Sequence, residues 1–266
     1  MKTLQLASVE LRVPDLARSV EFYSGQLGLS VVTHYGDHAE LAVEKTAPVL
    51  LVLTEARTAS PAPRDAAGLF HAALLLRHRS ALGQWLRTAA DRGIQFDGFS
   101  DHGVSEAIYL SDPDGNGLEI YADRPRTTWP FAANGEVAMT TQPLEVPSLL
   151  ATASPATESA TAGARWGHLH LRVTDLARSE AFYRTTLGLV VTQSTYPGAR
   201  FLAANGYHHH LGLNTWGAPR RPQPAGALGL AAATFRGPGL SKEARVSDPD
   251  GISLRLLPAP PRIAGA

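Results

Sequence analysis

Cysteine is absent from the 266 residues of this sequence. Disulfide bonds, thiolate metal sites and cysteine nucleophiles are therefore excluded together. Net charge is also lacking, because 24 Lys and Arg residues balance 24 Asp and Glu residues, which argues against nucleic acid or an anionic membrane as a partner. No apolar run approaches the roughly 20 residues of a membrane-spanning helix, and no charged-then-apolar leader precedes the strand-like start. We therefore expect a cytoplasmic protein that contacts neither nucleic acid nor membrane.

Two stretches of the chain repeat each other. LRVPDLARSVEFYSGQLGLSV, from Leu11, returns as LRVTDLARSEAFYRTTLGLVV, from Leu171, with 14 of 21 positions identical. Each copy has the pattern of a strand, an Asp cap, an amphipathic helix and a Leu-Gly-Leu exit into another strand. Further strands follow, so each copy predicts a βαβββ module. A second, more divergent module follows each copy, from Phe70 and from about Leu228.

The last of these four modules is shorter than the others. The turn sequence SDPDG at 111–115 returns at 247–251, an offset of 136 instead of the 160 between the first two copies. The missing stretch corresponds to the helix predicted from RSALGQWLRTAADRG. We expect residues 1–128 to hold modules one and two, and residues 165–260 to hold module three and a helix-less module four. Residues 129–164, rich in Ala, Ser, Thr and Pro, are predicted as a linker.

The stretch Asp101 to Tyr121, DHGVSEAIYLSDPDGNGLEIY, predicts a hairpin with polar side chains in a fixed order. Its DPDGNG turn joins two strands, because Pro presets φ and the two Gly residues accept left-handed angles. On the second strand Glu119 faces the side opposite its apolar neighbours. A lone Glu on such a strand usually faces solvent. Here, however, it shares the hairpin with His102 and Tyr109.

The order of His102, Tyr109, the Asp-Pro-x-Gly turn and Glu119 resembles the signature of the type I extradiol ring-cleavage dioxygenases of the vicinal-oxygen-chelate superfamily. Ser100, two residues before His102, is the one departure, because the family usually has Gly, Asn, Thr or a small aliphatic there. The resemblance implies that Glu119 ligates iron and that His102 and Tyr109 contact a bound catechol. It also implies an α+β fold in which four βαβββ modules, the fourth truncated, form two bowl-shaped mixed sheets. The two-domain bacterial catechol 2,3-dioxygenase type is similar over nearly the whole chain.

In that superfamily the metal ligands lie on the first and last strands of a module. The matching positions are His168 in module three, and His71 and Glu119 in module two. Modules one and four offer Ser8 and Arg255 instead. Taken singly, each His is more often a surface or hydrogen-bonded residue. Together with Glu119 they form the set of two imidazoles and one carboxylate that holds Fe(II), with Mn(II) as the alternative.

The run His208-His209-His210 is interpreted as the opening of a strand, YHHHLGLN, in which alternation sends His209 to the opposite face from its neighbours. Resemblance to the extradiol enzymes makes His209 the acid-base residue beside the oxygen site. His208 is the runner-up, because a register shift of one residue exchanges the two. The remaining histidines are interpreted as exposed or structural, namely His34, His38, His78 and His170.

The proposed ligands are incomplete in either half of the chain, so we predict that module two pairs with module three and module one with module four. The pairing can occur within one chain or between two chains of a homodimer. The predicted function is insertion of O2 into a catechol. One alternative is a glyoxalase-like metal-dependent lyase or isomerase, which would normally have a second carboxylate ligand. The other is a metal-free resistance protein that binds a small molecule.

Overall fold

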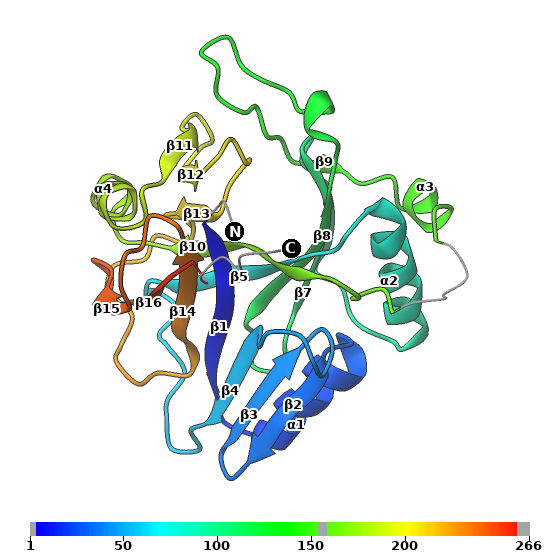
Figure 1. The fold of residues 1–266 in the computed structure, drawn as a ribbon, viewed down its shortest axis with the longest axis vertical. Helices are drawn as coiled ribbons and strands as arrows, with labels where there is room; N and C mark the ends of the chain where they lie inside the picture. Colours follow the sequence, from blue (N-terminus) through cyan, green and yellow to red (C-terminus); the bar gives the residue numbers. More distant parts are fainter. Residues whose placement is uncertain (1–3, 154–158, 260–266) are drawn as a thin grey trace, which may run out of the picture.

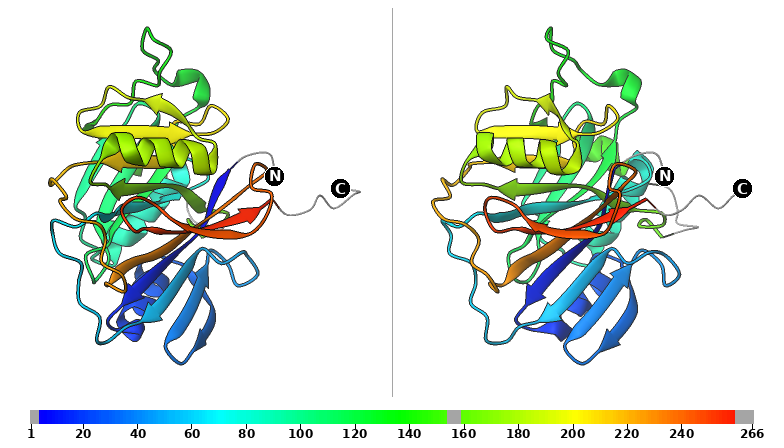
Figure 2. Two further views of the ribbon diagram at one scale, coloured as in Figure 1. Left: turned by 90° about the vertical axis from the view of Figure 1, so that its left-hand side faces the viewer. Right: turned by 60° about the vertical axis from the view of Figure 1, so that its left-hand side comes forward.

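The computed structural model describes residues 4–153 and 159–259. In these residues the strands form two curved sheets, one of seven strands and one of nine, with the longer helices on their outer sides (Figures 1 and 2). This confirms the predicted α+β fold. None of the helices in the described part of the chain is long and apolar enough to cross a membrane.

The elements follow the four predicted modules in chain order. Module one contains β1 (Gln5–Val13), α1 (Leu16–Glu21), the π-helical turn η1 (Phe22–Gln26), β2 (Ser30–Tyr35), β3 (His38–Ala42) and β4 (Leu51–Glu55). Module two contains β5 (Gly68–Leu75), α2 (Arg79–Asp91), β6 (Gly98–Asp101), β7 (Ser105–Ser111) and β8 (Gly117–Asp123), with the short 3-10 helix η2 (Arg126–Thr128) after it. Module three contains β10 (Arg165–Arg172), α4 (Leu176–Leu187), β11 (Val190–Gln193), β12 (Ala199–Ala203) and β13 (Leu211–Asn214). Module four contains β14 (Gly229–Gly237), β15 (Ala244–Ser247) and β16 (Ser253–Pro258), and residues 238–243, all of them described, contain no helix.

The repeated Asp begins the helix in modules one and three. Its carboxylate accepts a hydrogen bond from the backbone N–H three residues on, Asp15 from Arg18 at 3.0 Å and Asp175 from Arg178 at 2.9 Å. These bonds satisfy donors that the first helical turn leaves free. Helix α4 ends at Gly188, whose φ of 66° is the left-handed conformation that favours glycine. The sequence repeat is therefore also a structural repeat.

Each sheet combines one module from the first half of the chain with one module from the second half. The nine-stranded sheet has the order β11-β12-β13-β10-β5-β8-β7-β6-β9, so modules three and two meet where β10 pairs antiparallel with β5. The seven-stranded sheet has the order β15-β16-β14-β1-β4-β3-β2, so modules four and one meet where β14 pairs antiparallel with β1. In Figure 1 β1, from the start of the chain, lies beside β14, from near its end. Module two thus pairs with module three within a single chain.

Two buried tyrosine–aspartate hydrogen bonds connect the sheets. In one the tyrosine comes from module one, which belongs to the seven-stranded sheet, and in the other it comes from module three, which belongs to the nine-stranded sheet. Tyr23, from the helical segment of module one, donates to Asp112 in the turn between β7 and β8 at 2.8 Å. Tyr183, from α4 of module three, donates to Asp248 in the turn between β15 and β16 at 2.9 Å. Both tyrosines are fully buried, and burial beside an aspartate raises the pKa of each phenol well above 10. Each half of the chain therefore joins its own two modules across the sheets.

The segment predicted as a linker contains regular structure in its described part. β9 (Gln142–Pro143) pairs with β6 and adds an edge to the nine-stranded sheet. α3 (Val146–Leu150) packs against α2, where a Cβ on Gly83 would lie 2.5 Å from the carbonyl oxygen of Leu149. Residues 154–158 lie outside the described residues. The composition rich in Ala, Ser and Thr thus did not reveal that the chain here lies along the sheet and covers a helix.

Candidate metal centre

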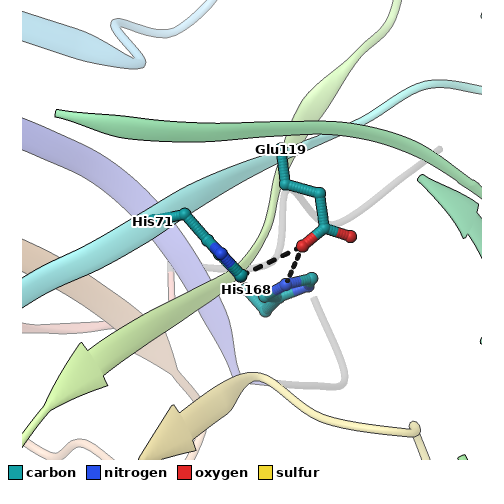
Figure 3. A group of neighbouring side chains, drawn as sticks. All are labelled: His71, Glu119 and His168. Carbon is teal, nitrogen blue, oxygen red and sulfur yellow. Dashed lines mark hydrogen bonds and ion pairs between the residues drawn. The ribbon is translucent and has the colours of Figure 1, made fainter. Parts of the chain in front are cut away.

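Three adjacent strands bring His71, Glu119 and His168 together (Figure 3). His71 lies on β5, Glu119 on β8 and His168 on β10, and the order β10-β5-β8 places the residues side by side in the nine-stranded sheet. Nε2 of His71 is 3.0 Å from Oε2 of Glu119, and Nε2 of His168 is 3.1 Å from the same oxygen. One ligand atom from each residue lies within 4.8 Å of the others. This group could hold a metal ion.

Gly117 allows the hairpin to approach β5 closely enough for this meeting. A Cβ at that position would lie 2.1 Å from the carbonyl oxygen of Phe70 and 3.2 Å from Cβ of His71. Any larger residue would push the start of β8 away from β5. Side-chain alternation then turns Glu119 to the same face as Tyr121 and buries Leu118 in the opposite core. The second Gly of the DPDGNG turn thus positions the proposed carboxylate ligand.

Burial and the neighbouring side chains determine the protonation states of Glu119 and His168. Glu119 is 2% exposed and His168 is 1% exposed. Burial alone would raise the pKa of Glu119, but the imidazoles of His168 and His71 hold it well below its ordinary value of 4.5. Burial lowers the pKa of His168 to about 4, against the opposing effect of Glu119. At neutral pH the site therefore contains a carboxylate and a neutral His168, the forms that bind a metal.

Two imidazole nitrogens of the possible metal ligands have no hydrogen-bond partner in the described part of the chain. Nε2 of His71 is buried and makes no hydrogen bond, although it is close to Glu119. Nδ1 of His168 is buried and unpartnered as well. Buried polar atoms normally find a partner, so such atoms beside a carboxylate need an explanation. Two imidazoles and one carboxylate fit a divalent transition metal and leave coordination positions open.

His102 and Tyr109 are hydrogen-bonded to each other on the hairpin. Nδ1 of His102 lies 2.6 Å from the carbonyl oxygen of Thr140, and its Nε2 lies 2.7 Å from the Tyr109 hydroxyl. A carbonyl only accepts, so Nδ1–H donates to Thr140 and Nε2 accepts from Tyr109. Tyr109 is the cross-strand partner of Glu119, and burial together with that carboxylate raises the pKa of its phenol well above 10. Tyr109 is therefore a protonated donor at neutral pH.

The histidine run lies before β13, which begins at Leu211, and does not open it as the sequence interpretation had it. Its side chains nevertheless point in different directions. The ring centroid of His209 is 4.0 Å from that of His168, whereas His208 packs 4.0 Å from Tyr207. His209 borders the same cavity as the three possible metal ligands, and His208 lies behind it. Burial, followed by the neighbouring histidines, lowers the pKa of His209 well below 6.5, so His209 is neutral at pH 7.

His208 connects His209 to an aspartate. Its Nε2 lies 2.9 Å from Oδ1 of Asp123, and its Nδ1 lies 2.8 Å from Nδ1 of His209. A carboxylate only accepts, so Nε2–H of His208 donates to Asp123 and Nδ1 of His208 is left as an acceptor. Nδ1–H of His209 then donates to it, which leaves the lone pair of His209 on Nε2. The chain of three residues thus fixes the tautomer of His209.

A cavity of about 540 Å³ encloses the site. Six predicted site residues border it, namely His71, His102, Tyr109, Glu119, His168 and His209. The sequence analysis interpreted His170 as exposed or structural and missed its place in the cavity wall, where it is 3% exposed. Phe70, Arg172 and Trp216 were also missed. Alternation along β10 was the available signal, because it places residues 168, 170 and 172 on one face.

The comparisons with known proteins agree with this architecture. The family model of the Glyoxalase/Bleomycin resistance protein/Dioxygenase superfamily matches residues 5–120 and 165–241, which include all three possible metal ligands. The chain belongs to this superfamily. A superfamily relative, the Catechol-2,3-dioxygenase of Bacillus subtilis (strain 168), is 42% identical over 226 residues, which cover 83% of this chain and 78% of that protein.

Solved structures show the same superfamily fold at low sequence identity. A protein from Bacillus subtilis subsp. subtilis str. 168 aligns with a TM-score of 0.64 and 13% identity, over 98% of this chain and 86% of its own. Glyoxalase I from Zea mays aligns with a TM-score of 0.58 and 15% identity, over 96% of this chain and 92% of its own. At such identities the likeness concerns the fold alone.

Proposed function

We propose that this protein is an extradiol dioxygenase, which cleaves a catechol ring beside its two hydroxyl groups with O2. The observation that supports this most strongly is the presence of His71, Glu119 and His168 in one cavity with His209 and Tyr109. The 42% identity to a Catechol-2,3-dioxygenase supports it independently. The ring bond adjacent to the diol breaks, the catechol is oxidised, O2 is reduced, and both oxygen atoms remain in the ring-opened product. We place this reaction in the cytoplasm.

The proposed cofactor is Fe(II), with Mn(II) as the alternative, held by His71, Glu119 and His168. When bound, such an ion supplies open coordination positions at which a catechol and O2 can meet. The protein contributes a carboxylate, a neutral His168 and a cavity partly lined by aromatic side chains. The orphaned Nε2 of His71 and the ionised Glu119 match the needs of the ion.

Tyr109 and His102 are assigned to the catechol oxygens. The Tyr109 hydroxyl already donates to His102, whose Nδ1–H is fixed by Thr140. A substrate oxygen that replaces this contact would accept from a phenol whose pKa is raised by burial and therefore keeps its proton. Because the fixed tautomer of His102 leaves its Nε2 as an acceptor, this His can take a hydrogen bond from a catechol hydroxyl. The pair thus orients the diol.

His209 is assigned the acid-base role. It is neutral at pH 7 and its Nε2 carries the lone pair, so it can accept a proton and later return it. It borders the cavity beside His168 and is absent from the group whose ligand atoms converge. An imidazole that remains off the metal keeps this capacity. Asp123 and His208 act through His209 by fixing its orientation.

The test is to remove metal from the protein, reload it anaerobically with Fe(II), Mn(II) or Zn(II), and add catechol and O2. We expect O2 uptake in step with a yellow ring-opened product for Fe(II) or Mn(II). The Glu119→Gln variant is the control, because it keeps the shape of the cavity and loses the ligand charge. Isomerase or lyase activity of the Zn(II) form, with no O2 uptake for any metal, would contradict the proposal and favour a glyoxalase-like enzyme. Binding without turnover and without metal would favour a resistance protein.

A further inference from the structure

Arg172 lies at the end of the cavity wall that starts with the possible metal ligand His168. Both residues are on β10, and His170 lies between them on the same face. At about 3.3 Å per residue, roughly 13 Å of strand separates Cα of His168 from Cα of Arg172. A ring held near His168 and a short side arm can span much of this distance, and the long arginine side chain can cover the rest.

The guanidinium of Arg172 has no counter-ion in the described part of the chain. Its side chain is partly buried, and its Nη2 donates to the carbonyl oxygen of Leu69 at 3.3 Å. Nε is buried and has no partner among the described residues. Burial lowers the pKa of Arg172, and no carboxylate opposes that effect. A partly buried cation without an anion is unfavourable, and a bound anion would relieve this.

The two carboxylates that border the cavity are engaged elsewhere. Glu119 contacts His71 and His168, and Asp97 accepts a hydrogen bond from Ser111 at 2.7 Å. Neither carboxylate forms an ion pair with Arg172. The anion that matches Arg172 must therefore come from outside the described chain.

Aromatic rings line the wall near Arg172. Phe70 lies with its ring centroid 5.1 Å from that of His170 and 5.3 Å from that of Trp216. These rings offer apolar faces to the carbon skeleton of a ligand, and the guanidinium offers N–H donors to its end. An aromatic ring with a short acidic arm fits this sequence of surfaces better than an unsubstituted catechol does.

We propose that the substrates are catechols with an anionic substituent, a carboxylate on a short arm, and that Arg172 binds this carboxylate. The inference rests on the proposed dioxygenase function and adds the substrate class. Arg172 is then a specificity-determining residue that contacts the arm and leaves the diol to the metal and Tyr109. Its internal-repeat equivalent is Arg12 on β1, which pairs with Gly229 as Arg172 pairs with Gly68. Arg12 lies in the sheet that lacks the metal-ligand set and offers a matched control.

The experiment compares a catechol that bears a carboxymethyl arm with the same compound whose arm is a primary amide. Anaerobic calorimetry on the metal-loaded protein gives the dissociation constants, and steady-state kinetics give kcat/KM. A charge-assisted hydrogen bond should favour the acid by about 10- to 100-fold in the wild-type protein. Arg172→Met should remove this preference by weakening binding of the acid more than binding of the amide, because the neutral arm loses at most an ordinary hydrogen bond. Arg172→Lys should keep part of the preference, and Arg12→Met should keep all of it.

Equal binding of acid and amide by the wild-type protein, or an unchanged preference in Arg172→Met, would overturn this inference. If catechol is cleaved in either case, the proposed dioxygenase function still holds. If no catechol is cleaved, the proposed function fails, and the calorimetric comparison still tests whether Arg172 binds the acid. A misfolded Arg172→Met would be recognised by loss of amide binding, and Arg172→Lys would then provide the comparison.

Discussion

Nδ1 of His208 lies 2.8 Å from Nδ1 of His209, and the two buried imidazoles form a direct hydrogen bond. The carboxylate of Asp123 determines the direction of this bond, because it accepts from the other nitrogen of His208 at 2.9 Å. The position of one proton behind the cavity therefore determines which nitrogen of His209 is basic. This relationship leads to the first of four predictions.

Asp123→Asn should lower kcat and leave both the metal content and KM for catechol nearly unchanged. The amide can donate to His208 where the carboxylate could only accept, which permits the wrong tautomer of His209. We expect a decrease of roughly 10- to 100-fold, below the full value of a positioned acid or base. Steady-state kinetics and metal analysis of the same sample provide the measurement.

The control for Asp123→Asn is Asp65→Asn, since Asp65 pairs with Arg221 at the surface. An unchanged kcat would show that the tautomer of His209 does not depend on Asp123.

His209→Ala should keep the metal and lose turnover. This residue borders the cavity but does not belong to the group of converging ligand atoms. We expect kcat to decrease by roughly 10²- to 10⁴-fold, the range of a positioned acid or base. Metal analysis, together with catechol titration in the absence of O2, separates binding from chemistry. A metal-free His209→Ala protein would instead identify His209 as a ligand.

His168→Ala should release the metal, although Glu119 and His71 come from the other half of the chain. Removal of one of three protein ligands should weaken binding by more than the roughly 10- to 100-fold typical of an outer hydrogen-bond partner. Equilibrium dialysis with a metal indicator measures the loss. His34→Ala is the control, because His34 is exposed on β2. Full metal occupancy in His168→Ala would mean that the site is not built from both halves.

The metal-free protein should lose stability as the pH falls below 6.5. The pKa values of His168 and His210 are lowered to about 4, mainly by burial, so these residues stay neutral in the folded state. The unfolded chain takes up their protons near pH 6.5, so protonation favours unfolding between these values. Each of these two histidines should lower the free energy of unfolding by about 2 kcal/mol as the pH falls from 6.5 to 5.

Urea unfolding at pH 7.5, 6 and 5, after a chelator has removed the metal from the protein, measures this pH dependence. His210→Gln should flatten it, because one neutral buried imidazole is removed at a position that does not border the metal-site cavity. His34→Gln should leave it unchanged. Constant stability from pH 7.5 to 5 would contradict the assigned protonation states.

The sequence allowed prediction of the modules because local motifs identify their helices and turns. It allowed prediction of their pairing because the possible metal ligands are divided between the two halves of the chain. The repeat of the Asp cap and the Leu-Gly-Leu exit identified the helices, and the DPDGNG turn identified the hairpin. The pairing followed from Ser8 and Arg255, which leave either half without a complete ligand set. The structure places modules two and three in one sheet, as that argument requires.

The features that were missed depend on tertiary contacts. The register of His208 to His210 is set by the contacts of His208 with Tyr207 and Asp123, which strand alternation does not predict. β9 is two residues long and pairs at a sheet edge, so it has no periodic pattern to find. Arg172 resembles its repeat partner Arg12 in sequence, and only the choice of sheet gives it a cavity.

The paired bonds Tyr23–Asp112 and Tyr183–Asp248 affect how the molecule comes apart. Each half of the chain contributes one module to each sheet and then ties those two modules together. Neither sheet can unfold without breaking these hydrogen bonds to modules of the other sheet. We therefore expect the two sheets to unfold as one cooperative unit in a single transition. The sheet that lacks the metal-ligand set therefore contributes to the stability of the metal site. Substitutions that disturb β15 or β16 should displace α4 through the Tyr183–Asp248 hydrogen bond and so alter the position of His168.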